Sequence, residues 1–233
     1  MRRGTSLLAL AVSTFLGGPA WAAAFGFVDD FSSPGTNGWT SFNSNTNPGT
    51  GGVGGSGDGY LNIAQFPSAF NFGSHNDGPN YTGDWAAAGI THVSFYLNDV
   101  NTDENFSFHF LVTGAEGPEG ESSWLYNTGF APPNGGWQQY SVDLTSNANW
   151  TRIRGSASFA NVLADVSDAH FRHDLAPFIT SPDPIKGDIG IDNITLVPEP
   201  GTLTLLAGIG LVVAGRRSIR EGPKCRYRSG SFE

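Results

Sequence analysis

One stretch of the sequence has carboxylate and amide side chains at alternating positions, a spacing at which their oxygens could bind a metal ion. Asp99, Asn101 and Asp103 follow the order in which a Ca²⁺-binding loop begins, with oxygen ligands two residues apart. The pattern then breaks, because Glu104 stands where the loop needs its turn glycine and Phe110 where it needs a bidentate Glu. We therefore interpret the stretch as a solvated turn between two strands.

Histidine supplies a second candidate for metal chemistry, in His170, His173 and Asp174. On a strand, residues three apart point to opposite faces, so the two imidazoles are not expected to converge on one ion. The letters Gly-x-Gly-x-x-Gly at 52–57 match a dinucleotide-binding fingerprint, but they precede a strand and open no helix. A glycine-rich loop is the better interpretation there.

Nucleophilic catalysis lacks its parts in this sequence. There is no Gly-x-Ser-x-Gly elbow, and the single cysteine, Cys225, stands in the C-terminal tail. Paired carboxylates could cleave glycosides, but the strand pattern Glu-x-Asp-x-x-Glu is missing. The sequence thus predicts a protein that is not an enzyme.

Tryptophans beside Gly, Asn or Asp are the remaining residues with binding chemistry. Aromatic rings stack on the apolar faces of sugars, and nearby polar side chains pair with the hydroxyls. Trp85, in Thr-Gly-Asp-Trp, and Trp124, in Ser-Ser-Trp-Leu-Tyr, have the most loop-like surroundings and are our carbohydrate-binding candidates. The alternative is that the tryptophans cap a hydrophobic core.

Strands must position these residues, because apolar side chains alternate with polar ones along much of the chain. Residues 90–99 and 105–113 show this alternation, and the polar turn between them predicts an antiparallel hairpin. Helical spacing occurs only at 158–166. The expected fold is all-β, a β-sandwich of jelly-roll type with one short helix. Its other expected strands are 25–31, 59–66, 138–144, 150–155, 170–174 and 188–197.

The last expected strand changes its pattern in the middle. Ile189 and Ile191 share one phase, whereas Ile194 and Leu196 have the opposite phase, with the change at 192–193. Either both faces of the strand are buried, or a β-bulge redirects the side chains, and bulges tend to lie next to functional sites.

Charge limits the partners of residues 25–197. This span has 18 acidic and four basic residues, a net charge of −14, against −9 for the whole chain. Such a surface repels nucleic acid and anionic lipid but suits Ca²⁺, so no nucleic-acid partner is expected. The span has no cysteine, so its stability must come from its core without disulfides.

The first 24 residues have the pattern of a secretory signal peptide. Arg2 and Arg3 are followed by an apolar stretch and by small-x-small cleavage sites ending at Ala22 and Ala24. The apolar stretch is shorter than the roughly 20 residues that span a bilayer. Residues 25–197 therefore form the expected domain, which is exported.

The C-terminal segment 198–217 follows a three-part pattern. Val197, Pro198, Glu199 and Pro200 precede an apolar run from 203 to 214, which is short for a permanent transmembrane span, and Arg216 and Arg217 follow it. The pattern resembles the PEP-CTERM sorting signal of Gram-negative, exopolysaccharide-producing bacteria. The resemblance implies transient membrane insertion and processing by an exosortase-type membrane protease, with the body placed at the cell surface or in the extracellular matrix. The basic tail 218–233, expected to be disordered, departs from the family, which usually ends near the arginines.

Short motifs in the body resemble the galactose-binding-like jelly rolls, which include carbohydrate-binding modules and laminin-B-like domains. They are Asp-Asp-Phe at 29–31, Gly-Trp at 38–39, Trp-x-x-Tyr-x-Val-x-Leu at 137–144 and Gly-Ile-Asp-Asn-Ile at 190–194. The resemblance implies neighbouring first and last strands with a structural Ca²⁺ between them. Its candidate ligands are Asp29, Asp30, Asp188 and Asp192. The alternative is that these aspartates keep a sheet edge soluble.

Together these features predict an exported, non-catalytic protein of the cell surface or extracellular matrix that associates with carbohydrate or exopolysaccharide. One alternative is a structural matrix protein without a specific ligand. Another, less favoured, is a glycan hydrolase or lyase.

Overall fold

The computed structural model describes residues 26–101 and 104–198. The expected signal peptide 1–24, the tail 218–233 and the sorting residues Glu199, Pro200, Arg216 and Arg217 lie outside the described residues. Within the described ranges, no helix is long and apolar enough to cross a bilayer.

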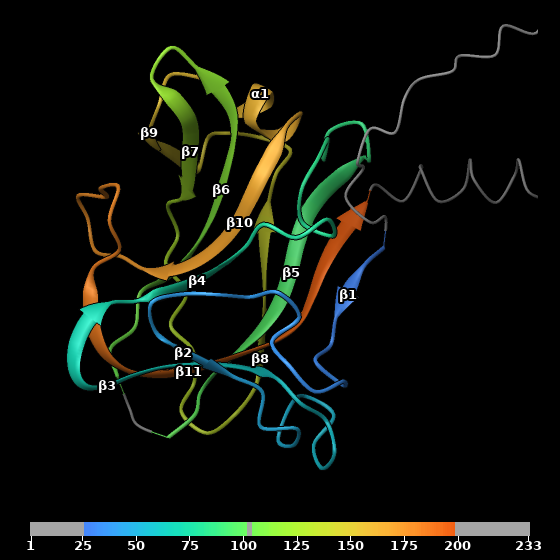
Figure 1. Ribbon diagram of the computed structural model, residues 1–233, viewed down its shortest axis with the longest axis vertical. Helices are drawn as coiled ribbons and strands as arrows, with labels where there is room; N and C mark the ends of the chain where they lie inside the picture. Colours follow the sequence, from blue (N-terminus) through green and yellow to red (C-terminus); the bar gives the residue numbers. More distant parts are fainter. Residues whose placement is uncertain (1–25, 102–103, 199–233) are drawn as a thin grey trace, which may run out of the picture.

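Two β-sheets pack face to face, which confirms the predicted all-β sandwich (Figure 1). Sheet A has the strand order β2-β3-β11-β5-β8, and β1 also pairs with β11. Sheet B has the order β4-β10-β6-β7-β9. The strands of sheet A are β1 (Val28–Asp29), β2 (Ser44–Thr46), β3 (Leu61–Asn71), β5 (Ile90–Asp99), β8 (Gln138–Asp143) and β11 (Pro184–Pro198). Those of sheet B are β4 (Gly73–Asn76), β6 (Phe108–Gly117), β7 (Gly120–Tyr126), β9 (Trp150–Arg154) and β10 (Val166–His173).

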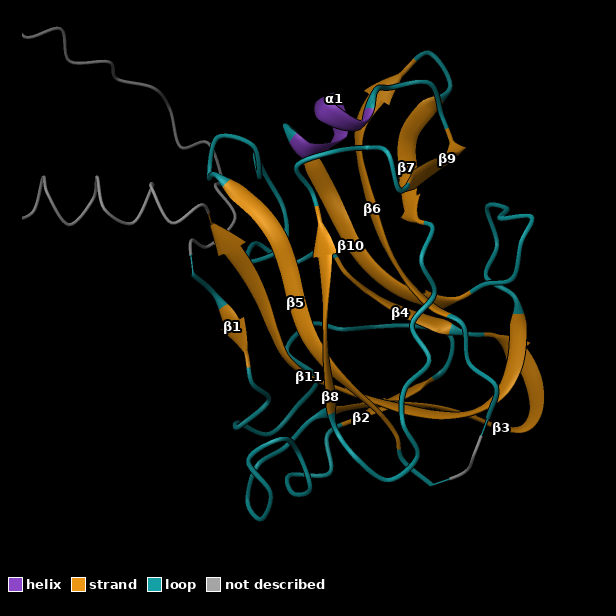
Figure 2. Cartoon of the chain, turned by 180° about the vertical axis from the view of Figure 1, so that it is seen from behind, coloured by secondary structure: helices purple, strands orange, loops and turns teal. Residues whose placement is uncertain are grey.

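The core lies between the sheets and is rich in aromatic rings, because each strand turns its apolar positions inward. Phe171 of β10 stacks on Phe108 of β6 at 5.9 Å and meets Phe95 of β5 edge-on at 4.7 Å. The helix α1 (Phe159–Leu163) covers one end of sheet B and buries Phe159, Val162 and Leu163 (Figure 2). Ser158 caps it by accepting a hydrogen bond from the Asn161 backbone N–H.

The predicted hairpin of residues 90–99 and 105–113 is wrong. β5 belongs to sheet A and β6 to sheet B, so the turn between them passes from one sheet to the other. The alternation was correctly located, but it shows only that each strand has one apolar face. Those faces meet across the sandwich instead of lying side by side. The sequence also missed β2, β4 and β7, whose residues are mostly small or polar.

The change of phase in β11 is a β-bulge. Its pairing with β5 shifts register between Asp192 and Thr195, and Asn193 has a φ of 51°. Ile189, Ile191, Ile194 and Leu196 are all fully buried, so the bulge brings both halves of the strand into the core. β1 pairs with β11 just beyond this point, so the first and last strands are neighbours as the resemblance implied.

Candidate functional site

The outward face of sheet B carries a groove formed by two adjoining cavities of about 230 and 190 Å³. The groove runs across all five strands, roughly 19 Å at the usual strand spacing. His170 and Thr180 line both cavities. The first cavity also contains Phe42, Asn43, Asn71 and His75, and the second contains Thr113, Glu121, Arg154 and Asp168.

The first cavity combines ring faces with amide groups. His75 of β4 and His170 of β10 are directly paired, and their rings lie 5.7 Å apart at 62°. Phe42 stands beside them with 94% of its surface exposed. The neighbouring Asn43 is buried, and its amide N–H donates to the Asn71 carbonyl at 3.0 Å while its side-chain oxygen accepts from the Gly73 N–H at 2.9 Å. The loop that presents Phe42 is therefore fixed to β4.

His170 is an uncharged imidazole in this cavity. Burial, followed by the electrostatic effects of Arg172 and then His75, lowers its pKa to about 3. His173 does not join it, because its Nδ1 accepts from the Ser107 backbone N–H at 3.1 Å and its ring packs against Phe106. The two histidines of the sequence motif therefore act separately, as their spacing on a strand predicted.

The second cavity contains a carboxyl with an unusual proton affinity. Asp168 follows a register shift in β10, and its Oδ1 is buried without a hydrogen-bond partner. Burial, and then the charges of Asp77 and Glu121, raises the pKa of Asp168 to about 7. Glu121 accepts a hydrogen bond from the Ser167 hydroxyl at 2.8 Å. Arg154 is the exposed cation of this cavity.

Asp168→Asn is expected to stabilise the domain at pH 8 but not at pH 4. The folded state holds the Asp168 proton more tightly than the unfolded state, so the wild type loses stability as the pH rises from about 4 to 7. The neutral amide removes that loss, which we expect to be about 1–3 kcal/mol at pH 8 after allowing for partial solvation. Urea unfolding at both pH values measures it. Asp165→Asn, an exposed aspartate nearby, is the control and should change neither curve; equal gains in both variants would contradict the assignment.

Residues 175–183, which we call the covering segment, fold over the outward face of sheet B. Phe178 contacts the His109 ring at 5.1 Å, and the Thr180 hydroxyl donates to the Ile153 carbonyl of β9 at 3.4 Å. Arg172 donates to the Ile179 and Thr180 carbonyls at 2.9 and 2.8 Å and forms a buried ion pair with Asp174. This segment thus forms a wall of the groove.

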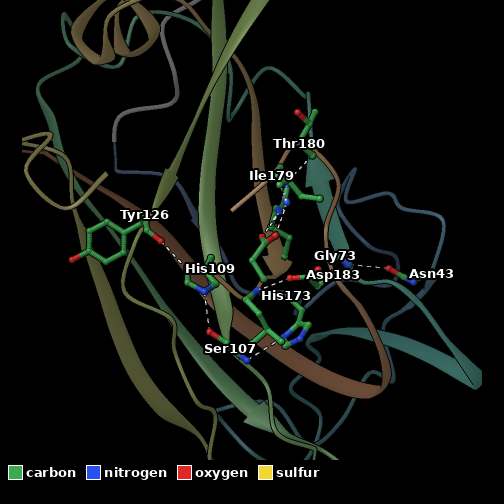
Figure 3. Close-up of polar contacts among 12 residues, drawn as sticks. Asn43, Gly73, Ser107, His109, Tyr126, His173, Ile179, Thr180 and Asp183 are labelled. Atoms are coloured by element: carbon green, nitrogen blue, oxygen red, sulfur yellow. Dashed lines mark hydrogen bonds and ion pairs between the residues drawn. The ribbon is translucent and has the colours of Figure 1, made fainter. Parts of the chain in front are cut away.

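Beneath the covering segment lies a polar chain that resembles catalytic machinery but is closed. The His109 Nδ1 contacts the Tyr126 carbonyl at 2.8 Å, so it carries the proton, and Nε2 faces the Ser107 hydroxyl at 2.9 Å (Figure 3). His109 is only 2% exposed. The chain ties β6 to β7, and we assign it a structural role.

The tryptophan candidates do not line the groove. Trp85 was a wrong choice: it is fully buried, lies parallel to Phe110 and donates to the Tyr81 carbonyl at 3.1 Å. Trp124 is half-buried in β7, where its N–H donates to the Ala157 carbonyl. Phe159 meets its ring edge-on at 5.6 Å, and the Arg152 guanidinium lies 5.9 Å from the ring centre. The competing interpretation, core packing, applies to Trp85, whereas Trp124 is partly buried and packs against the core from its edge.

The four aspartates proposed as one Ca²⁺ site do not come together. Asp29 is buried and accepts from the Trp39 N–H at 2.9 Å and from the Tyr81 hydroxyl at 3.0 Å. Burial raises its pKa despite these donors. Asp30 is exposed. Asp29 therefore fixes the first strand to the core, and its oxygens serve protein donors.

Asp192 and Asp188 lie in different surroundings. Asp192 accepts from the Val53 N–H at 2.8 Å, and Asp58 accepts from the Gly54 N–H, so both carboxylates cap the glycine-rich loop. Burial, and then the charges of Asp58 and Asp30, raises the pKa of Asp192 to about 6. The loop is thereby attached to the bulge in β11.

Asp188 instead joins the turn after Asp99, whose opening residues resemble a Ca²⁺ loop but which the sequence pattern led us to interpret as a solvated turn. One oxygen each from Asp99, Glu104 and Asp188 lies within 4.8 Å of the others, the one such acidic group found among the described residues. Asp99 and Asp188 are each 1% exposed. Asn101 donates to Asp188 from its backbone and from its side chain. Oxygen donors of this kind suit a hard cation such as Ca²⁺.

Sequence reasoning missed the residues that line the groove. Phe42, His75 and Asp168 stand in short polar stretches without a motif, and 95 residues separate His75 from its partner His170. The available signal was the outward phase of β10, which places Asp168, His170 and Arg172 on one face.

Comparison with solved structures finds carbohydrate-binding modules of low sequence identity. The family 11 module from Clostridium thermocellum, solved with a β-1,3-1,4-mixed-linked tetrasaccharide, is 14% identical over 74% of this chain and 95% of its own, with a TM-score of 0.47. The CBM22-1 xylan-binding domain from Paenibacillus barcinonensis is 14% identical over 76% and 99%, with a TM-score of 0.48. An exo-β-agarase matches over 76% of this chain and 25% of its own, at 15% identity and a TM-score of 0.48.

No curated protein matches the sequence. The C-terminal pattern, in contrast, matches a specific family model. The family model for the PEP-CTERM protein-sorting motif matches residues 196–220, which include the Pro-Glu-Pro sequence, the apolar run and both arginines. The motif implies export, sorting to the cell surface and processing by an exosortase. This chain carries the PEP-CTERM protein-sorting motif directly after a two-sheet β-sandwich.

Proposed function

We propose that this exported β-sandwich is a non-catalytic protein that binds carbohydrate in the groove of sheet B, at the surface or in the extracellular matrix of a Gram-negative bacterium. One observation carries the proposal. The groove places an exposed aromatic ring and two partly exposed imidazoles beside amide, hydroxyl and carboxyl groups. Rings of this kind stack on the C–H face of a sugar, and the polar groups pair with its hydroxyls.

The shape of the groove supports a chain-like ligand. Its two cavities are adjacent, with His170 and Thr180 in the lining of both, and each is smaller than the roughly 300–1,000 Å³ of a site for a compact drug-sized molecule. A short oligosaccharide would place successive rings in successive cavities. The exopolysaccharide of the producing cell is the proposed natural ligand, because the sorting motif delivers the domain to the cell surface.

Binding assays with the secreted protein test this function. We expect retention on the producer's own exopolysaccharide and ask whether mixed-linkage β-glucan, xylan or agarose is also bound. Phe42→Ala and His170→Ala should each weaken binding at least tenfold, about 1.4 kcal/mol, because each removes a ring from the groove. Phe66→Ala is the matched control, since Phe66 is also an exposed phenylalanine but lies on β3 of sheet A. Failure to bind any of these polysaccharides, with or without Ca²⁺, would contradict the proposal.

The same experiments separate the alternatives. If the protein is a structural matrix protein without a ligand, the wild type and the Phe42→Ala variant should be retained in the matrix equally. A glycan hydrolase or lyase would release reducing ends, and that release would require Asp168 and Glu121, the two carboxyls of the second cavity.

We also propose that the domain binds a structural Ca²⁺ at Asp99, Glu104 and Asp188 instead of at the four aspartates expected from the sequence. The proposal is supported by the convergence of their oxygens and by the net charge of the domain. Two of these carboxylates are buried, so a bound cation would relieve the repulsion between them.

Calcium should therefore raise the melting temperature. At a Ca²⁺ concentration 100 times the dissociation constant, the gain is about 2.7 kcal/mol, or roughly 5–10 °C for a domain of this size. Asp188→Asn should abolish the increase, whereas Asp30→Asn, in an exposed aspartate of the original set, should retain it. A melting temperature that EDTA leaves unchanged would contradict the metal site.

A further inference from the structure

The last strand of the sandwich runs without a linker into the sorting motif. β11 ends at Pro198, the first residue of the Pro-Glu-Pro sequence, and its pairing with β5 continues to that residue, with Val197 opposite His92 and Pro198 opposite Ile90. The Thr91 hydroxyl donates to the Val197 carbonyl at 3.3 Å. Pro198 is buried. The fold therefore includes the beginning of the motif.

The end of β11 is an interior part of sheet A. β5 pairs with it on one side, while β1 pairs with Ile194 and Thr195 on the other (Figure 1). Ile194 and Leu196 are both fully buried. Removal of these residues would expose the core and leave β1 without its partner strand.

A protease needs an extended segment whose backbone N–H and C=O groups are free to enter its cleft. Upstream of Pro198 those groups belong to the sheet, so cleavage there requires β11 to separate from β5 and Leu196 to leave the core. Proteolysis of a native protein through such local opening follows the small population of the open state. Pro198 is the last described residue that pairs with β5, so cleavage after it removes none of the strand pairs described above.

We propose that the processing protease cuts the already folded protein no earlier than the Pro198–Glu199 bond, so that the mature protein keeps all of β11. The inference rests on the sorting part of the proposed function and is independent of carbohydrate binding. In the hydrolysis, the peptide C–N bond breaks, the carbonyl carbon takes the hydroxyl of water, and the amide nitrogen takes the proton. The sandwich thus sets the upstream limit of its own processing.

Two measurements on the full chain test the inference. The first is mass spectrometry of the mature C-terminus from an exosortase-bearing host, where we expect the last residue to be Pro198 or a later one. The second is limited digestion of purified full-length protein with proteinase K, which should trim the C-terminus and stop at or just after Pro198. A host product that ends at Val197 or earlier, or a chain that the host leaves unprocessed, would overturn the proposal. Either outcome leaves the carbohydrate assay unaffected, so the two failures are distinguishable.

A matched pair of variants tests the protecting contact. Thr91→Val removes the hydroxyl that holds the Val197 carbonyl, and a net hydrogen bond changes an opening equilibrium by about 2- to 12-fold. We expect proteinase K cleavage upstream of Pro198 to accelerate by that factor. Thr128→Val removes a surface hydroxyl bonded to Asn149 and should leave the rate unchanged. If proteinase K cleaved Thr91→Val and the wild type at equal rates upstream of Pro198, the Thr91–Val197 hydrogen bond would have no protecting role.

Discussion

Arg172→Met is expected to destabilise the domain by about 3–5 kcal/mol at pH 8. Arg172 and Asp174 are 2% and 0% exposed, and the substitution leaves the carboxylate buried without its counter-charge. The Ile179 and Thr180 carbonyls lose their donors in the same step, so the covering segment loses its attachment to β10. Urea unfolding measures the loss of stability. Polysaccharide affinity, measured below the melting temperature, shows whether the groove is also disturbed.

The loss should be smaller at low pH. Burial already raises the pKa of Asp174 in the wild type, although Arg172 opposes the shift. Without the guanidinium the folded state takes up a proton more readily, so the stability of the variant increases as the pH falls towards 4. Arg172→Lys should be intermediate, because an ammonium keeps the charge but cannot match the planar fork that binds the carboxylate and both carbonyls. A variant within 1 kcal/mol of the wild type at pH 8 would show that the pair does not hold the segment.

Trp85→Ala is expected to cost about 3–5 kcal/mol of stability and to leave no specific defect in binding. The indole is fully buried, so its removal leaves a large cavity beside Phe110. Trp85→Phe keeps a ring but loses the N–H bond to Tyr81, and should cost about 1–2 kcal/mol. Thermal unfolding and binding below the melting temperature measure the two effects separately.

Trp124→Ala is the comparison for Trp85. Trp124 is half-buried and contacts Phe159 at the rim of the core, so its removal should cost less than that of Trp85. If Trp85→Ala lowered affinity tenfold while its melting temperature stayed at the wild-type value, the original assignment of Trp85 to a sugar platform would be right and the packing described above would be wrong.

Local patterns in the sequence predicted much of the fold, because alternation reports directly which face of a strand is buried. The residues of β5, β9 and β11 were placed almost correctly, and the phase change in β11 correctly marked an irregular point. Strands such as β4, with the residues Gly-Ser-His-Asn, were missed because they have no apolar alternation and are held by neighbours distant in the sequence.

The candidate site could not be located from local pattern alone. Polar residues beside a tryptophan show only that a turn is close, and the indole of Trp85 points inward from such a turn. The groove depends on β4 lying beside β10 and on residues 175–183 folding back over sheet B. Both are long-range pairings, and neither leaves a periodic trace in the sequence.

The sequence by itself determined the export and sorting of this protein and its all-β class, because a sorting motif and strand alternation are written in consecutive residues. The tertiary structure alone decided which side chains share a cavity, which carboxylates converge and that the last strand extends into the sorting motif. Those properties arise when strands from distant parts of the chain pair and bury their shared faces, so they depend on the sheet order and not on any one stretch of residues.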